Sequence, residues 1–137
     1  MEQKTITLVQ ESFEKVKPIA ATAAEMFYSK LFELDPALKP LFPTGEEAMK
    51  TQGNKLMTML AAAVAGLSNL EALVPVLQNL GKKHVEYKVV PSHYNTVGAA
   101  LLGTLSVGLG DDFTPEVEEA WTSVYTTMST VMIEASY

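Results

Sequence analysis

Apolar residues recur along most of the chain every three or four positions, which is the spacing of one face of an α-helix. The first such segment covers residues 5–17 and stops at Pro18, and the second covers residues 19–34. The stripe of the first segment consists of Ile6, Val9, Phe13 and Val16. Few segments alternate with a period of two, the pattern of a half-buried strand. The sequence therefore predicts helices almost throughout.

Turn-forming residues divide the rest of the chain. Asp35 followed by Pro36 is typical of a helix start and predicts a short turn that ends near Phe42. We expect Pro40 and Pro43 to break the chain and later helices to cover residues 44–66, 70–84, 91–105 and 114 onward, with a connector at 88–90 and a turn at 108–112. The expected inner stripe of the 44–66 helix is Leu56, Met59, Leu60, Ala63 and Leu67. The predicted fold class is all-α, with six to eight helices in a single domain, residues 1–137.

Composition adds limits on the kind of protein. The chain is 47% hydrophobic and 19% charged, enough apolar material for a core without metal or disulfide support. Ten basic and 16 acidic side chains give a formal net charge of −6, which argues against nucleic acid as a partner. Residues 1–5 lack the layout of a secretory signal, and the apolar stretch 56–67 is short for a membrane span. We expect a cytoplasmic protein.

The residue inventory removes several kinds of site. The chain has no cysteine, which excludes disulfides, zinc–thiolate sites, iron–sulfur clusters and covalently attached haem. Neither Glu-x-x-His nor HExxH occurs, and no Gly-x-Ser-x-Gly motif marks a nucleophile, although counting alone leaves a Ser/His/Asp triad open. A cofactor site would use oxygen ligands or one of the two histidines, His84 and His93.

Each candidate residue also has a purely structural interpretation. His84 ends an amphipathic helix, where a cation is favoured by the helix dipole. His93 stands at a helix start beside Pro91, which suggests a surface or capping role. The helical spacing of Trp121 and Tyr125 is typical of core contacts. For the methionines we expect packing rather than metal ligation, which applies to Met49, Met57 and Met59.

Several short motifs acquire meaning through their common order. They are Phe27-Tyr28-x-x-Leu31-Phe32-x-x-x-Pro36, Leu41-Phe42, Gln52-x-x-x-Leu56, His84 with Tyr94 ten residues later, and Glu119-Ala120-Trp121-x-x-x-Tyr125. With this order and spacing the chain resembles bacterial single-domain haemoglobins and the haemoglobin domain of flavohaemoglobins over essentially its whole length. The resemblance implies a globin fold around haem b.

The resemblance also assigns roles to residues. His84 would be the proximal ligand of the haem iron, and Tyr94 would hydrogen-bond near its imidazole. Tyr28 and Gln52 would be distal donors to bound O2. Because residue 52 is not a histidine, ligation of the iron by two histidines through this position is excluded, while direct approach of Gln52 to the iron and a bound water both stay open. The remaining cofactor contacts would be Phe42 stacked on the haem, Leu56 on the distal side, Lys83 at a propionate, and Val89 and Val97 on the proximal side.

Three functions fit such a pocket. They are reversible O2 binding for storage or delivery, nitric oxide dioxygenation to nitrate, and gas sensing through a partner, with NO and CO as further ligands. We expect a dioxygenase cycle to use a separate reductase, and the protein to be a monomer or homodimer. The glutamate of the flavohaemoglobin proximal relay falls on Ser136, and Glu134 lies about 200° around the helix from it. We therefore expect a weak electron push from the proximal side.

Overall fold

The computed structural model describes residues 2–42 and 45–137. This part of the chain holds six α-helices and no strand, which confirms the predicted all-α class. The α-helices are α1 (Gln3–Val16), α2 (Ala20–Leu34), α3 (Glu46–Gly66), α4 (Leu70–Glu86), α5 (Pro91–Leu109) and α6 (Pro115–Ser136). Short 3₁₀ turns join them at η1 (Lys17–Ile19), η2 (Pro36–Leu41), η3 (Leu67–Asn69) and η4 (Gly110–Asp112).

The helix starts agree with the polar residues that predicted them. Asp35 accepts a hydrogen bond from the Ala37 N–H at 3.1 Å, and Thr114 accepts one from the Val117 N–H at 3.3 Å. His93 Nδ1 accepts from the Val90 N–H at 3.2 Å, so its predicted capping role is confirmed. The predicted break at Pro43 and the helix start at Thr44 lie outside the described residues.

Two details of the prediction are wrong. Helix α5 continues through the first two residues of the expected turn at 108–112, because Leu109 is buried on the same face as the rest of its stripe, and only the last three residues form the turn, as η4. Met59, expected in the inner stripe of α3, is 38% exposed, whereas Met49 and Met57 pack against the core. Leu56 and Leu60 face inward, and Met59 lies about 100° around the helix from Leu60.

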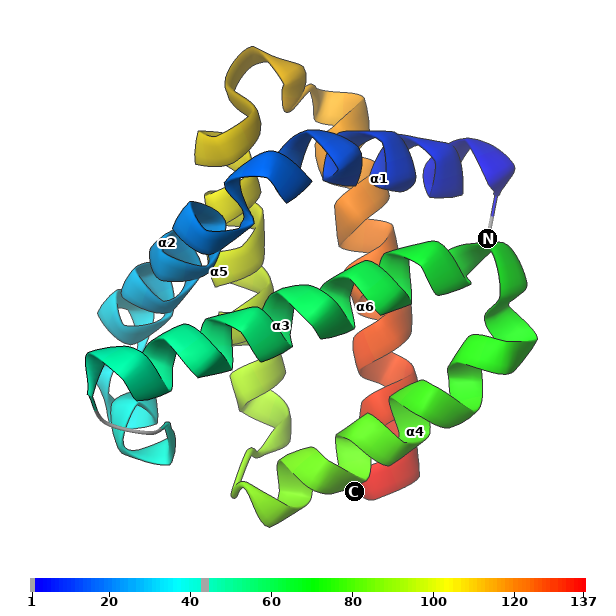
Figure 1. The fold of residues 1–137 in the computed structure, drawn as a ribbon. Coiled ribbons are helices and arrows are strands. Elements are labelled where there is room, and N and C mark those ends of the chain that lie inside the picture. Colours follow the sequence, from blue (N-terminus) through cyan, green and yellow to red (C-terminus); the bar gives the residue numbers. More distant parts are fainter. Residues whose placement is uncertain (1, 43–44) are drawn as a thin grey trace.

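The helices cross one another in pairs instead of forming a parallel bundle. In Figure 1, α5 and α6 run side by side while α1 and α3 cross in front of them. Helix α2 packs on α5, and α4 and α1 each pack on α6. Such steep crossings let side-chain ridges of one helix fill grooves of another. The fully buried side chains at these contacts include Trp121, Phe13, Leu31, Leu67, Val9 and Val124.

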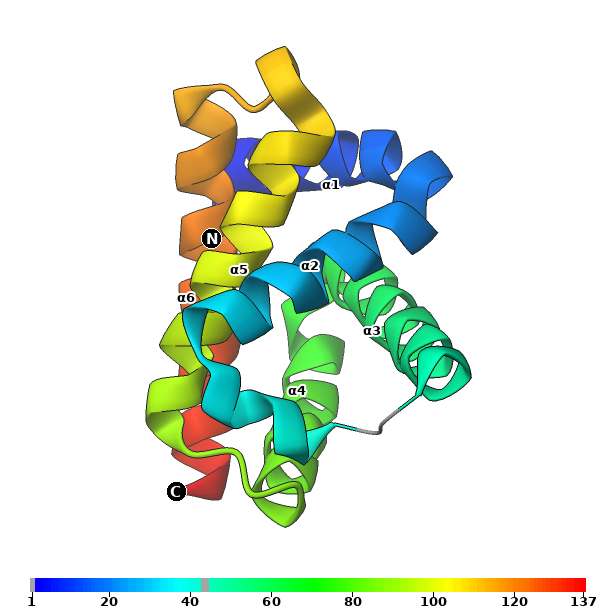
Figure 2. The ribbon, with the colours of Figure 1, turned by 90° about the vertical axis from the view of Figure 1, so that its left-hand side faces the viewer.

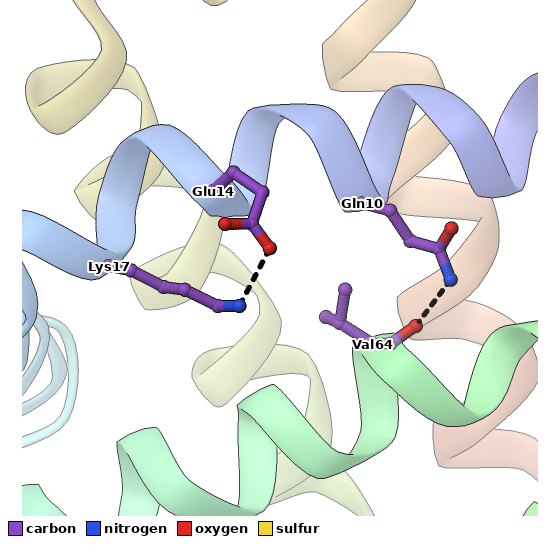
Figure 3. Close-up of polar contacts among 4 residues, drawn as sticks. All are labelled: Gln10, Glu14, Lys17 and Val64. Carbon is purple, nitrogen blue, oxygen red and sulfur yellow. Dashed lines mark hydrogen bonds and ion pairs between the residues drawn. The ribbon is translucent and has the colours of Figure 1, made fainter.

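Helix α1 is tied to two neighbours by polar contacts. The Trp121 indole N–H donates to the Ser12 hydroxyl at 2.8 Å inside the core, which links α1 to α6. The Gln10 amide donates to the Val64 carbonyl of α3 at 3.0 Å (Figure 3). The Glu14–Lys17 ion pair beside it, at 2.7 Å, is exposed, and such pairs contribute little to stability.

The segment Glu46–Glu86 contains an 18-residue window with a mean hydropathy of 1.7, apolar enough for a bilayer by composition alone. The structure divides this segment at η3 into α3 and α4, which take different directions (Figure 1). Leu67, Leu73 and Leu77 bury their side chains in the core. The apolar segment therefore contributes side chains to the core of this fold.

Candidate functional site

Two expected site residues lie on helices that diverge from a common corner. Helices α3 and α4 meet at η3 and spread apart like the arms of a V (Figures 1 and 2). Gln52 lies 15 residues before Leu67 on one arm, and His84 lies 15 residues after Asn69 on the other. At the rise of an α-helix, both are about 22 Å from the corner. The fold thus brings a distal candidate and a proximal candidate to the same level of the two arms.

His84 is held through one of its two ring nitrogens. Its Nδ1 lies 3.0 Å from the hydroxyl of Tyr94, which is buried on α5. The two rings meet edge-on, with centroids 5.7 Å apart. Burial lowers the pKa of His84 below its usual 6.5, which favours the neutral imidazole over the cation of the structural interpretation. This geometry orients the ring and leaves Nε2 outside the Tyr94 contact.

Tyr94 is itself anchored by a residue to which the sequence assigned only packing. The Tyr125 hydroxyl, on α6, donates to the Tyr94 backbone carbonyl at 2.6 Å. Its ring lies against Gly98, where an added Cβ would come within 2.7 Å of a Tyr125 ring carbon. Burial, followed by the neighbouring Tyr94, raises the pKa of the Tyr125 phenol, so that it remains a donor. The spacing of Tyr94 and Gly98 on one face of α5 is the only sequence signal for this contact.

The distal candidates gather around a small aromatic cluster. Tyr28 is 6% exposed, and its ring centroid lies 5.4 Å from that of Phe42 and 6.0 Å from that of Phe32. Burial raises the pKa of Tyr28, and the nearby Gln52 side chain opposes part of that rise. The phenol therefore stays protonated with an amide beside it, so α2, η2 and α3 place two potential donors next to apolar rings.

The remaining predicted residues differ in exposure. Leu56, Val89 and Val97 are half-buried and pack against the core, whereas Lys83 is exposed. Glu134 is exposed, as expected for a side chain that faces away from the site. The Ser136 hydroxyl is buried on α6 and has no hydrogen-bond partner among the described residues.

The residues present fit a flat apolar cofactor with a single axial ligand. A neutral, oriented imidazole is the usual proximal ligand of haem iron. Its hydrogen-bonded neighbour fixes the ring orientation and tunes the metal. Half-buried side chains such as Leu56, Val97 and Phe42 provide apolar surface against which a porphyrin can pack. The fold and the donor set are compatible with an α-helical haem protein.

The comparisons with known proteins agree with that class. Residues 25–132 match the family model described as Globin. The chain belongs to the globin family, and membership implies a haem-binding protein that takes diatomic gases.

The similar curated proteins are longer than this chain. It is 30% identical over 132 residues to a flavohemoprotein of Vibrio cholerae, covering 96% of this chain and 34% of that protein. Identity is 30% over 125 residues with a flavohemoprotein of Bacillus subtilis, covering 91% and 31% respectively. With a flavohemoprotein of Xylella fastidiosa it is 35% over 121 residues, covering 88% and 30%. The chain thus spans about a third of their length and is related to their globin domain.

Proposed function

We propose that the chain is a haem b globin that binds O2 reversibly, takes NO and CO at the same site, and converts NO and O2 to nitrate when a separate reductase supplies electrons. The observation that carries this proposal is the 3.0 Å contact between His84 Nδ1 and the Tyr94 hydroxyl. It orients a neutral imidazole whose other nitrogen is available to a metal. When bound, the haem supplies an iron that binds a diatomic gas and can change its oxidation state by one electron.

The proximal residues hold and orient that cofactor. His84 would hold the haem iron through Nε2, while the Tyr94 hydroxyl at Nδ1 orients the imidazole ring. Tyr125 keeps Tyr94 in place through its backbone carbonyl. Val89 and Val97 supply apolar contacts on this side, and Lys83 is exposed beside His84, where it can pair with a propionate.

The distal residues select the gas. Tyr28 and Gln52 provide an O–H and an N–H donor, which favour a diatomic gas that gains negative charge over one that stays neutral. A hydrogen bond to a charged acceptor contributes about 1.5–3 kcal/mol, enough to retain O2 roughly ten- to a hundredfold longer. Leu56 and Phe42 add half-buried apolar side chains on this side. Retained O2 has time to meet NO, so the same donors support dioxygenation.

The dioxygenase reaction needs an electron source. NO and O2 combine with one electron to give nitrate, so each turnover consumes one reducing equivalent. The relatives are named flavohemoproteins, and this chain aligns with about a third of each. In this proposal a separate reductase supplies that electron.

Hemin titration of the purified protein tests the cofactor assignment. We expect one hemin per chain with a sharp Soret band, and loss of that spectrum in His84→Ala with recovery on adding imidazole. The matched control is His93→Ala, which removes the other histidine, the cap of α5, and keeps the spectrum. Identical hemin spectra of His84→Ala and the unaltered protein would contradict the axial role.

Nitrate yield tests the enzymatic part separately. Reduced, O2-equilibrated protein mixed with NO is expected to give one nitrate per haem. A yield near zero from protein that still binds O2 reversibly would reduce the proposal to O2 storage or delivery.

A further inference from the structure

Tyr137 reaches from the end of α6 back to the segment behind His84. Its hydroxyl donates to the backbone carbonyl of Val89, in the connection between α4 and α5. Its ring meets the Tyr94 ring edge-on, with centroids 6.5 Å apart and an interplanar angle of 85°. The Val89 N–H donates in turn to the His84 carbonyl at 2.9 Å. Tyr137 therefore contacts both Tyr94, whose hydroxyl lies at the His84 imidazole, and the backbone of Val89, just after the end of α4.

The donors and acceptors around His84 leave one proton to be placed. An imidazole that offers Nε2 to iron carries its proton on Nδ1, so Nδ1–H donates to the Tyr94 oxygen. The Tyr94 hydroxyl proton then needs an acceptor, and Tyr94 is 4% exposed, which leaves little access to water. The Val89 carbonyl already receives the Tyr137 proton, so the Tyr137 oxygen is free to accept another.

Electrostatics agree with this placement. Burial raises the pKa of Tyr94 to about 12, with a smaller contribution from the neighbouring Tyr137 phenol. The Ser136 hydroxyl, one residue earlier, is buried without a partner among the described residues, so it does not share in this network. Glu134 is exposed.

We propose that Tyr137 is a positioning residue for the proximal histidine, and that it accepts the Tyr94 hydroxyl proton in a chain that runs from His84 through Tyr94 and Tyr137 to the Val89 carbonyl. The proposal rests on the proposed function. This series of hydrogen bonds ends on a neutral carbonyl instead of a carboxylate, so the imidazole stays close to neutral. Hydrogen bonds in series polarise one another. Loss of the Tyr137 hydroxyl therefore weakens the hydrogen bond between His84 Nδ1 and the Tyr94 oxygen.

Three variants of the haem-loaded protein test this: Tyr137→Phe, Tyr94→Phe and the double variant. The readouts are a redox titration and the ferrous iron–histidine stretching band in resonance Raman spectra.

Tyr137→Phe is expected to reduce electron donation by His84, raising the ferrous-to-ferric ratio at fixed potential roughly threefold and lowering the stretching frequency. In the Tyr94→Phe background the same change is expected to have no further effect. Tyr87→Phe, which alters a ring that is 59% exposed, is the matched control and should match the unaltered protein.

Two outcomes overturn the role of Tyr137. One is an unchanged potential and stretching band in Tyr137→Phe, and the other is a shift that persists in full without the Tyr94 hydroxyl. Failure of the chain to take up hemin would instead refute the proposed function. In that case ¹⁵N NMR of the His84 ring in haem-free protein decides, since a smaller fraction of the Nδ1–H tautomer is expected in Tyr137→Phe and an equal fraction overturns the role.

Discussion

Among single residues, Tyr28 has different surroundings for its aromatic ring and for its hydroxyl. Its ring packs edge-on against Phe27 and Phe42, with centroids 5.1 and 5.4 Å apart, while its hydroxyl has the Gln52 side chain as polar neighbour. Removal of the hydroxyl therefore leaves the apolar packing intact. A Tyr→Phe substitution here changes hydrogen bonding and little else.

We expect Tyr28→Phe to raise the O2 dissociation rate about tenfold, because a charge-assisted hydrogen bond is lost. The CO dissociation rate is expected to change much less, since CO gains little negative charge. Stopped-flow ligand replacement measures both rates. Tyr87→Phe serves as a control at an exposed phenol. An unchanged O2 rate in Tyr28→Phe would remove this residue from the donor role.

His84 gives the haem-free protein a predictable dependence on pH. Burial holds its folded-state pKa below the unfolded value of 6.5, so below that pH the unfolded chain binds more protons at this residue. The free energy of unfolding should therefore fall as the pH decreases from about 6.5 to the folded-state pKa and then level off. Urea unfolding of the unaltered protein and of His84→Phe checks this. Equal slopes against pH in the two proteins would contradict it.

Among the elements, α4 and α6 come into close contact at Gly81, three residues before His84. A Cβ at this position would lie 2.6 Å from the Met132 carbonyl oxygen and from the Ser136 hydroxyl oxygen. The backbone of α6 cannot yield as the end of a flexible side chain could. Gly81 therefore sets the spacing of the helix pair that carries His84 on one side and Tyr137 on the other.

Gly81→Ala is expected to destabilise the protein by about 1–3 kcal/mol through overpacking, and to speed haem loss because α4 shifts. Gly108→Ala is the matched control, since a Cβ there would meet the Ile19 side chain at 3.4 Å, an ordinary contact. That variant should be neutral or slightly more stable, because alanine is favoured over glycine within a helix. Thermal unfolding and haem transfer to an apoglobin acceptor measure both effects. Equal stability of the two variants would contradict this, because it would mean that α4 and α6 move apart at Gly81 without loss of stability.

In the molecule as a whole, stability and gas binding depend on different contacts. The Trp121 indole sits fully buried between α1 and α6, and its N–H donates to Ser12, whose hydroxyl donates to the Val9 carbonyl at 3.0 Å. None of these residues belongs to the candidate site. They hold α1 against α6.

Ser12→Ala should lower the free energy of unfolding by about 1–3 kcal/mol, because the buried indole N–H loses its acceptor. Urea unfolding followed by circular dichroism measures the change, with Ser106→Ala, at an exposed position of α5, as control. The O2 dissociation rate is expected to stay the same in both. A changed rate in Ser12→Ala would mean that the α1–α6 contact and the site are coupled.

The sequence by itself determined the features that depend on near neighbours. Helical stripes and the caps at Asp35 and Thr114 follow from side chains within four residues of one another, so the all-α class and most helix bounds could be predicted. The same rules left Met59 on the wrong face, because two adjacent positions of an apolar helix look alike in composition. The motif order around Tyr28, Gln52, His84 and Tyr94 pointed to the candidate site through resemblance alone.

Only the tertiary structure decided which groups meet across long stretches of chain. The Tyr125 hydroxyl reaches the Tyr94 carbonyl over 31 positions, and the Tyr137 hydroxyl reaches the Val89 carbonyl over 48. Both acceptors are backbone carbonyls, which are chemically the same at every residue, so no side-chain pattern marks them. Which carbonyl lies in reach depends on where α6 crosses α5 and α4. That crossing follows from the packing of the whole core, including the close approach at Gly81.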